Sequence, residues 1–170
     1  MGLHCLSMAL ISAATKQQPE LITNRTMASI IFRSADKSLS LAGKNALKEF
    51  IIRLFKKEKH TLGSVTYVFC SDEYLLQINR DFLQHDYYTD IITFGLSGKG
   101  EPIEAEIYIS IDRVKDNAAN LGVSFTNEVC RVIFHGALHL CGYKDKRKSE
   151  IATMRAKEDQ YLRLYQKQVS

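Results

Sequence analysis

The chain has 170 residues, of which 45% are hydrophobic and 25% charged. This length and composition suit one domain with one sizeable core and exclude a disordered or fibrous chain. An excess of 23 Lys and Arg over 19 Asp and Glu gives a net charge of +4, which permits an anionic partner without requiring one. No apolar run approaches the roughly 18 residues of a membrane helix, so we expect no membrane span.

The cysteines and the N-terminal segment indicate in which cellular compartment the protein is located. The four cysteines form no CxxC pair and have no spacing typical of a zinc cluster or a disulfide framework, so we expect a reducing, cytoplasmic location. A short apolar run near the start lacks the basic residues that precede it in a signal peptide. We interpret residues 1–26 as a mobile N-terminal extension and residues 27–170 as one domain.

Strand and helix patterns alternate after this extension. Residues 28–34 form a β-branched and aromatic run typical of a strand, and residues 41–59 place apolar side chains at helical spacing with a basic end. Residues 63–70 alternate as a strand does, and residues 71–83 predict a helix with a serine N-cap.

The second half of the chain predicts two more strands and then three helices. The strands are expected at residues 89–96 and 103–111, on either side of a turn-like segment. The helices are expected at residues 112–121, 125–141 and 147–166. This order predicts an α/β (α+β) fold, in which a single domain has a mixed sheet of about four strands packed with about five helices.

A pair of histidines lies in the second of these helices. His135 and His139 are one turn apart, so they share a face with Cβ atoms about 5–6 Å from each other. Zinc–imidazole bonds of about 2.0–2.1 Å allow two such side chains to bind one tetrahedral ion. Gly142 is a natural helix terminator, and the turn that it permits would bring Asp145 back to the same ion as a third ligand.

The HxxxH spacing alone leaves the interpretation open. Such a pair also arises by chance, or as two histidines that are solvated or satisfied by hydrogen bonds in the core. A glycine and a carboxylate follow the pair at once, and the apolar helix would otherwise bury two polar rings. These two features favour a metal site.

The stretch HGALHLCGY, residues 135–143, resembles the signature of the YbeY endoribonuclease family, which reads HGxLHLxGYDH. INRDFLQHDYYTDIITF is similar to the family's LNxxYRxxDxPTDVLSF, and AEIYIS lies where the family has GDIxIS. The resemblance extends from about Ile30 to Leu164. It implies a single α/β domain, a metal held by three histidines and usually taken as zinc, and action on RNA in ribosomal RNA maturation and ribosome quality control.

Three positions near the candidate site depart from the family pattern. Asp145 replaces the third histidine of the signature, and Lys144 replaces the aspartate before it. Aspartate also binds zinc, at about 2.0–2.2 Å, and its harder, anionic oxygen widens tolerance toward other divalent ions. Leu83 stands where the family has an arginine, which removes a positive group expected near the substrate phosphate. The candidate RNA-binding residues that would compensate are Arg80, Lys144, Lys146 and Arg147.

The resemblance implies a metal-binding hydrolase domain that acts as a single-strand-specific endoribonuclease on 16S ribosomal RNA, with the small ribosomal subunit as its partner. His135, His139 and Asp145 would hold one Zn²⁺, or another divalent ion. The ion would lower the pKa of water from about 15.7 toward 7, so the catalytic candidates are His135 and this activated water. Glu106 and Glu150 are candidates for a general base by residue type alone, because most such carboxylates are solvated.

Charge and aromatic residues indicate how RNA would bind. Residues 144–148, KDKRK, place four cations beside the candidate ion, and neutralised phosphates release counterions. The same run is also typical of a solvated helix start. Tyr87 and Tyr88 are candidate base-stacking surfaces, although tyrosines of this kind more often serve in packing.

Two other functions stay open. A non-catalytic ribosome-binding or RNA-binding factor would account for a metal site weakened by Asp145 and Leu83. A metallohydrolase of peptides or small esters is less consistent with the sequence. HExxH peptidases carry their general base directly after the first histidine, where this chain has Gly136.

Overall fold

A computed structural model describes Ala9–Leu10 and residues 27–169. The strands are β1 (Ala9–Leu10), β2 (Ser29–Ser34), β3 (Leu62–Cys70), β4 (Ile91–Gly95) and β5 (Ile103–Ser110). The helices are α1 (Lys44–Lys57), α2 (Asp72–Leu83), α3 (Ile111–Leu121), α4 (Phe125–Leu140) and α5 (Lys148–Val169). The predicted order of strands and helices is confirmed, and β1 is an additional two-residue strand.

The strands form one mixed sheet in the order β1-β4-β5-β3-β2. Strands β2, β3 and β5 are parallel, β4 runs antiparallel to β5, and β1 pairs in parallel with β4. This arrangement confirms the α/β class. The prediction of a mobile extension over residues 1–26 lies outside the described residues, apart from β1. Among the described helices, none combines the length and the apolar character needed to cross a membrane.

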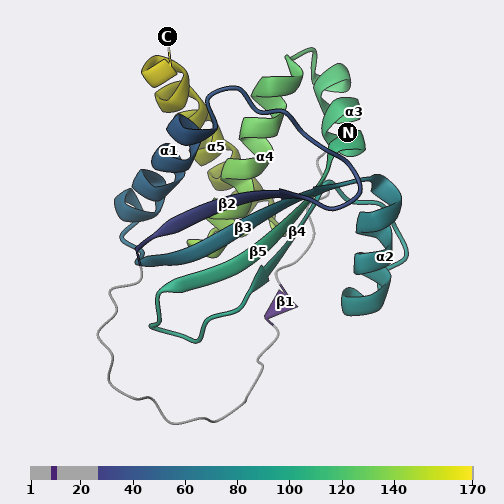
Figure 1. Ribbon diagram of the computed structural model, residues 1–170, viewed down its shortest axis with the longest axis horizontal. Helices are drawn as coiled ribbons and strands as arrows, with labels where there is room; N and C mark the ends of the chain where they lie inside the picture. Colours follow the sequence, from purple (N-terminus) through teal and green to yellow (C-terminus); the bar gives the residue numbers. More distant parts are fainter. Residues whose placement is uncertain (1–8, 11–26, 170) are drawn as a thin grey trace.

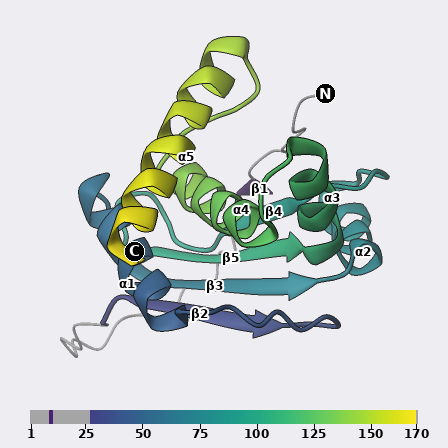
Figure 2. The same ribbon diagram turned by 90° about the horizontal axis from the view of Figure 1, so that it is seen from above.

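Helices cover one face of the sheet. Figure 1 shows α1, α4 and α5 above the strands, with α2 at the right-hand end. Figure 2 shows α4 near the middle of this layer, and α4 packs against α3, α5 and β4. On the opposite face, Cys70, Ile92 and Phe94 form a second, smaller core with Leu75 of α2. The fold thus places α4 between the sheet and α5, so its side chains face both.

Helix α4 approaches the sheet closely at Gly136. A Cβ atom there would lie 2.9 Å from Cδ1 of Ile91 and 3.1 Å from Cγ2 of Ile107. Both isoleucines are buried, so the position after His135 faces a packed core. A glutamate has no room there, and the packing therefore argues against an HExxH peptidase.

The chain reverses direction after α4. Gly142 has a φ of +91°, in the left-handed region that favours glycine. The Tyr143 N–H donates to the Leu138 carbonyl at 3.1 Å, and the Gly142 N–H donates to the His139 carbonyl at 2.9 Å. These hydrogen bonds close the end of the helix and confirm the predicted terminator. They direct the following residues, Asp145 among them, back toward α4.

The carboxylate of Glu58, directly after α1, joins three parts of the structure. It accepts hydrogen bonds from Tyr143 Oη in the α4–α5 loop at 2.9 Å, from Lys157 Nζ of α5 at 2.8 Å, and from Tyr161 Oη of α5. The Lys157 ammonium also lies over the Tyr143 ring, 5.1 Å from its centroid. Glu58 therefore fixes the beginning of the loop that carries Asp145.

Replacing Glu58 by glutamine is expected to lower the free energy of unfolding by about 1–3 kcal/mol at pH 7, because charged hydrogen bonds are lost. Burial raises the pKa of Glu58, but its hydrogen bonds outweigh burial and hold the pKa below the ordinary 4.5. A lowered carboxylate pKa stabilises the fold above the unfolded-state pKa, and this contribution is lost as the pH falls through the folded-state value. Urea unfolding at a series of pH values should show the wild-type advantage shrinking below about pH 4.5.

Glu49→Gln is the matched control for this measurement, because Glu49 is exposed on the same helix. It should change the free energy of unfolding by less than about 0.5 kcal/mol. A Glu58→Gln effect of the same size at every pH would contradict the assigned hydrogen-bonded carboxylate.

Candidate metal centre

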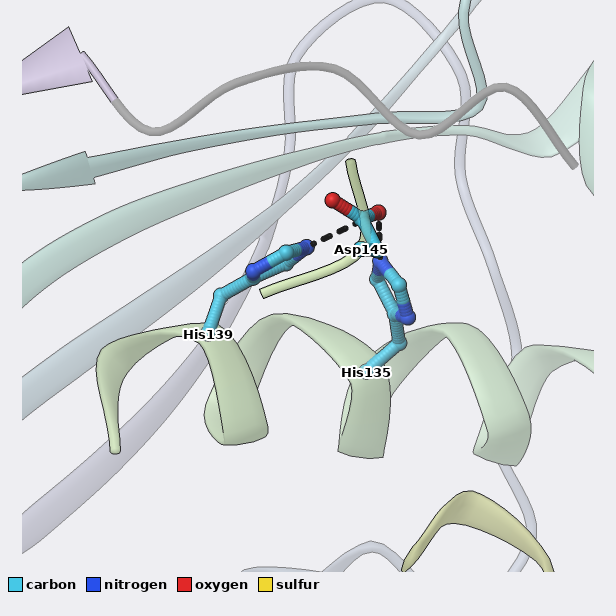
Figure 3. A group of neighbouring side chains, drawn as sticks. All are labelled: His135, His139 and Asp145. Carbon is cyan, nitrogen blue, oxygen red and sulfur yellow. Dashed lines mark ion pairs between the residues drawn. The ribbon is translucent and has the colours of Figure 1, made fainter. Parts of the chain in front are cut away.

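Three side chains from α4 and the loop after it converge on one point (Figure 3). Nε2 of His135 lies 3.6 Å, and Nε2 of His139 lies 3.4 Å, from Oδ2 of Asp145. One ligand atom from each residue lies within 4.8 Å of the others. Two ligand atoms on a tetrahedral ion with bonds of about 2.0–2.1 Å are about 3.4 Å apart. The three residues therefore fit around one metal ion.

Hydrogen bonds at Nδ1 orient both imidazoles. Nδ1 of His135 lies 2.7 Å from Oε1 of Glu158 in α5, and Nδ1 of His139 lies 2.9 Å from the carbonyl oxygen of Tyr143. Because both oxygens accept, each Nδ1 carries the hydrogen. In the neutral rings, the Nε2 lone pairs then face Asp145. Histidine metal ligands generally have this arrangement, with the second nitrogen donating to a carboxylate or carbonyl.

Glu158 connects His135 to a buried ionic group. Its Oε2 accepts a hydrogen bond from Arg131 Nη1 at 3.1 Å, and the same Nη1 lies 2.8 Å from Oδ1 of Asp159. Arg131 Nε lies 3.7 Å from Oε2 of Glu128, whose side chain is fully buried. Burial raises the pKa of Glu128, and Arg131 opposes this effect only in part. The Arg131 guanidinium therefore interacts with three carboxylates, and one of them, Glu158, also contacts His135.

Carboxylates determine the charge around His135. Burial lowers the pKa of His135, but the hydrogen bond to Glu158 and the charges of Glu158, Asp90 and Asp145 raise it above the ordinary 6.5. Burial raises the pKa of Asp90, and the nearby His135 opposes that increase. Asp90 Oδ2 also accepts a hydrogen bond from Asn117 Nδ2 at 3.2 Å. The carboxylates of Asp145 and Glu158, which lie at the two nitrogens of His135, suit a bound cation.

The structure places the predicted RNA-binding residues in two locations. Lys144, Lys146 and Arg147 are exposed on the loop that carries Asp145. Arg80 lies on α2 and pairs with Asp86, with Nε 2.6 Å from Oδ1. Leu83, at the end of α2, packs half-buried against the smaller core. The three loop cations are thus neighbours of Asp145 in the sequence, whereas Arg80 belongs to a different element.

The predicted general bases do not join the three ligands. Glu106 alternates along β5 with the buried Ala105 and Ile107, so it faces away from α4, and it accepts a hydrogen bond from Tyr108 Oη at 2.8 Å. Glu150 accepts hydrogen bonds from the backbone N–H groups of residues 146 and 147, at 3.1 and 3.0 Å, and so caps the start of α5. Both carboxylates have structural roles.

Besides Asp145, the carboxylate that contacts a candidate ligand is that of Glu158, which was not among the predicted site residues. Glu158 is 3% exposed and lies on the face of α5 that also buries Met154, Tyr161 and Leu162. A carboxylate on the apolar face of an amphipathic helix needs a buried partner. The acidic residue at an apolar position of the helix was therefore the sequence feature that could have identified Glu158.

Comparisons with known proteins place this chain in a family. The sequence model of the family described as Endoribonuclease YbeY matches residues 29–166. An Endoribonuclease YbeY from Cytophaga hutchinsonii is 51% identical over 135 residues, which cover 79% of this chain and 94% of that protein. One from Porphyromonas gingivalis is 41% identical over 143 residues, covering 84% of this chain and 94% of that protein.

A solved structure shares the fold of this chain. The solution structure of a Thermotoga maritima protein matches with a TM-score of 0.56 and 28% sequence identity. The match covers 80% of this chain and 88% of that one. With the family match over most of the chain and relatives of high identity, the chain belongs to the Endoribonuclease YbeY family.

Proposed function

We propose that the protein is a metal-dependent endoribonuclease that cleaves single-stranded RNA during maturation of 16S ribosomal RNA and in ribosome quality control. The convergence of His135, His139 and Asp145 carries this proposal. Membership of the Endoribonuclease YbeY family supports RNA as the substrate class. The partner would be the small ribosomal subunit.

The cytoplasm is the proposed location. Cys70, Cys130 and Cys141 are free thiols among the described residues, and free cysteines are typical of a reducing compartment. Ribosomal RNA, the proposed substrate, would be available to the protein there.

Zinc is the proposed ion, held by His135, His139 and Asp145, and the carboxylate ligand would extend tolerance to harder ions such as Mn²⁺. A divalent ion there supplies a Lewis acid that activates water and polarises a phosphoryl oxygen at neutral pH. The chain itself orients the ligands. Glu158 holds the His135 ring, and the carbonyl of Tyr143 holds the His139 ring.

The loop cations would bind the substrate backbone. Lys144, Lys146 and Arg147 are exposed and flank Asp145 in the sequence, so their charges would meet a phosphate that approaches the candidate centre. Each phosphate that they neutralise releases counterions and strengthens binding at low salt. They would hold a phosphodiester against the metal centre while the buried histidines remain oriented.

His139→Ala is expected to abolish metal retention and RNA cleavage, because it removes one of three ligands. Metal content would be measured by mass spectrometry on protein purified without added metal, and cleavage on a labelled single-stranded RNA. His60→Ala is the matched control, since His60 is exposed beyond α1. Undiminished cleavage by metal-free His139→Ala protein would exclude the proposal. RNA binding that survives chelation of wild-type protein, without any turnover, would instead indicate a non-catalytic RNA-binding factor.

Two substitutions at Asp145 test the unusual ligand. Asp145→Ala should lower the metal content per chain, and equal content in variant and wild type would exclude Asp145 as an important ligand. Asp145→His should retain zinc but bind Mn²⁺ less well than the wild type does, because a carboxylate is the harder ligand. Both proteins would be equilibrated with equal concentrations of Zn²⁺ and Mn²⁺ and analysed for bound metal.

Glu158→Gln should weaken metal affinity about 10- to 100-fold, the usual effect of losing a carboxylate that orients a metal-binding histidine. Asp159→Asn is the control, because Asp159 is the next residue and also pairs with Arg131, but its side chain is 48% exposed. Affinity would be measured by competition with a chelator. Equal losses of metal affinity in the two variants would show that affinity depends on the ion pairs of Arg131. The hydrogen bond from His135 to Glu158 would then not contribute to it.

A further inference from the structure

Two consecutive tyrosines are exposed between α2 and β4. Tyr87 is 41% and Tyr88 is 48% exposed. Each ring is covered on one side by another planar group. His85 stacks against Tyr87, with ring centroids 5.2 Å apart and an interplanar angle of 23°. The guanidinium of Arg113 lies over Tyr88, 4.9 Å from the ring centroid.

Contacts with α2 and α3 hold this segment. The buried Asn79 side chain donates a hydrogen bond to the Tyr87 carbonyl at 2.8 Å. Arg113, which lies over Tyr88, forms an ion pair with Asp72, with Nε 2.9 Å from Oδ2. The tyrosines are therefore positioned by the fold before any ligand arrives. A pre-positioned side chain loses less entropy on binding than a mobile one.

The segment leads into β4, whose first residue packs against α4 next to His135. Ile91, three residues after Tyr88, packs against Gly136, the residue that follows His135; its Cδ1 lies 2.9 Å from the position of a Gly136 Cβ. Three residues of extended chain span at most about 11 Å. The charge of Asp90, between Tyr88 and Ile91 in the sequence, also acts on His135. Tyr88 therefore lies within about 11 Å along the chain of the strand residue that packs against α4 next to His135.

The chemistry of this segment differs from that of the α4–α5 loop. Lys144, Lys146 and Arg147 offer positive charge, which attracts the phosphates of single and double strands alike. Tyrosine rings instead offer flat apolar faces, on which a base stacks whatever its sequence. A base is available for such stacking when it is unpaired and turned out of its own stack.

We propose that Tyr87 and Tyr88 form a stacking platform for unpaired bases of the RNA strand whose phosphate lies at the metal centre. The platform makes the site selective for single-stranded RNA, while the loop cations hold the backbone. This inference rests on the proposed ribonuclease function and extends it to the recognition of the bases.

The contribution of Tyr88 to base stacking is tested with two RNA decamers, one that has bases and one that lacks them. One probe is a fluorescein-labelled 2′-O-methyl decauridylate, checked on a gel for integrity, and the other is an abasic decamer with the same phosphates. Tyr88→Ala should weaken binding of the decauridylate roughly 5- to 100-fold, as expected for one stacked base, and binding of the abasic decamer less than twofold. Tyr88→Phe keeps the ring and should bind both probes as the wild type does.

Further variants extend the comparison. Tyr87→Ala should also weaken binding of the decauridylate more than binding of the abasic decamer. Tyr74→Ala is the matched control, because Tyr74 is 40% exposed on α2, and it should leave both affinities unchanged. In cleavage assays, the combined Tyr87→Ala and Tyr88→Ala variant should lose most of its preference for a single strand over a hairpin.

Equal weakening with both decamers would overturn the platform, because Tyr88 would then act through the fold or the phosphates. Unchanged binding in all tyrosine variants would overturn it as well. In both cases, the ribonuclease function would still be supported if the wild type cleaves RNA and the His139→Ala variant does not. Wild-type protein that neither binds nor cleaves RNA would overturn both proposals.

Discussion

The orientation of two imidazole rings is the constraint on which the candidate centre depends. Rotation of either ring by 180° about its Cβ–Cγ bond would exchange Nδ1 with Cδ2 and Nε2 with Cε1, so that ring carbons would face Asp145 and the orienting oxygen. The carboxylate of Glu158 and the carbonyl of Tyr143 prevent this, because each accepts a hydrogen bond from Nδ1. The ligands are thus arranged by the protein, and metal binding does not have to supply the energy of ordering them.

These orienting groups are themselves held by distant elements. Tyr143 donates to Glu58 at the end of α1, and Glu158 accepts from Arg131 of α4. Compared with well-packed apolar side chains, buried charges of this kind contribute little net stability, although removing one partner alone leaves the other unpaired and is destabilising. Their retention is better explained by geometry than by stability. The same contacts that join α1, α4 and α5 also determine where the ligand atoms lie.

The sequence predicted the parts of the centre that depend on local structure. His135 and His139 share a helix face because of their spacing, and Gly142 ends that helix because it adopts a positive φ. Asp145 follows so soon that the turn alone brings it back. The alternation of strands and helices was predicted for the same reason, since hydrophobic periodicity is a local property.

The orienting groups could not be predicted in this way. Glu158 follows His135 by 23 positions, and Glu58 precedes Tyr143 by 85. Their contacts depend on how α5 and α1 pack against α4, which no local pattern determines. Glu106 and Glu150 were chosen by residue type, and the structure shows them facing away from α4 and capping α5. Residue type without tertiary position was insufficient.

The replacement of two neighbouring signature residues would keep an aspartate ligand compatible with an anionic substrate. The family signature has aspartate followed by histidine, with a net charge of −1, whereas this chain has Lys144 followed by Asp145, with a net charge of 0. The negative charge has moved to the buried side chain beside the two imidazoles, and a positive charge stands on the exposed one. A carboxylate ligand lowers the effective charge of the ion and so weakens its attraction for phosphate. Lys144, one residue away and exposed, returns a positive charge to the surface that a phosphodiester would approach.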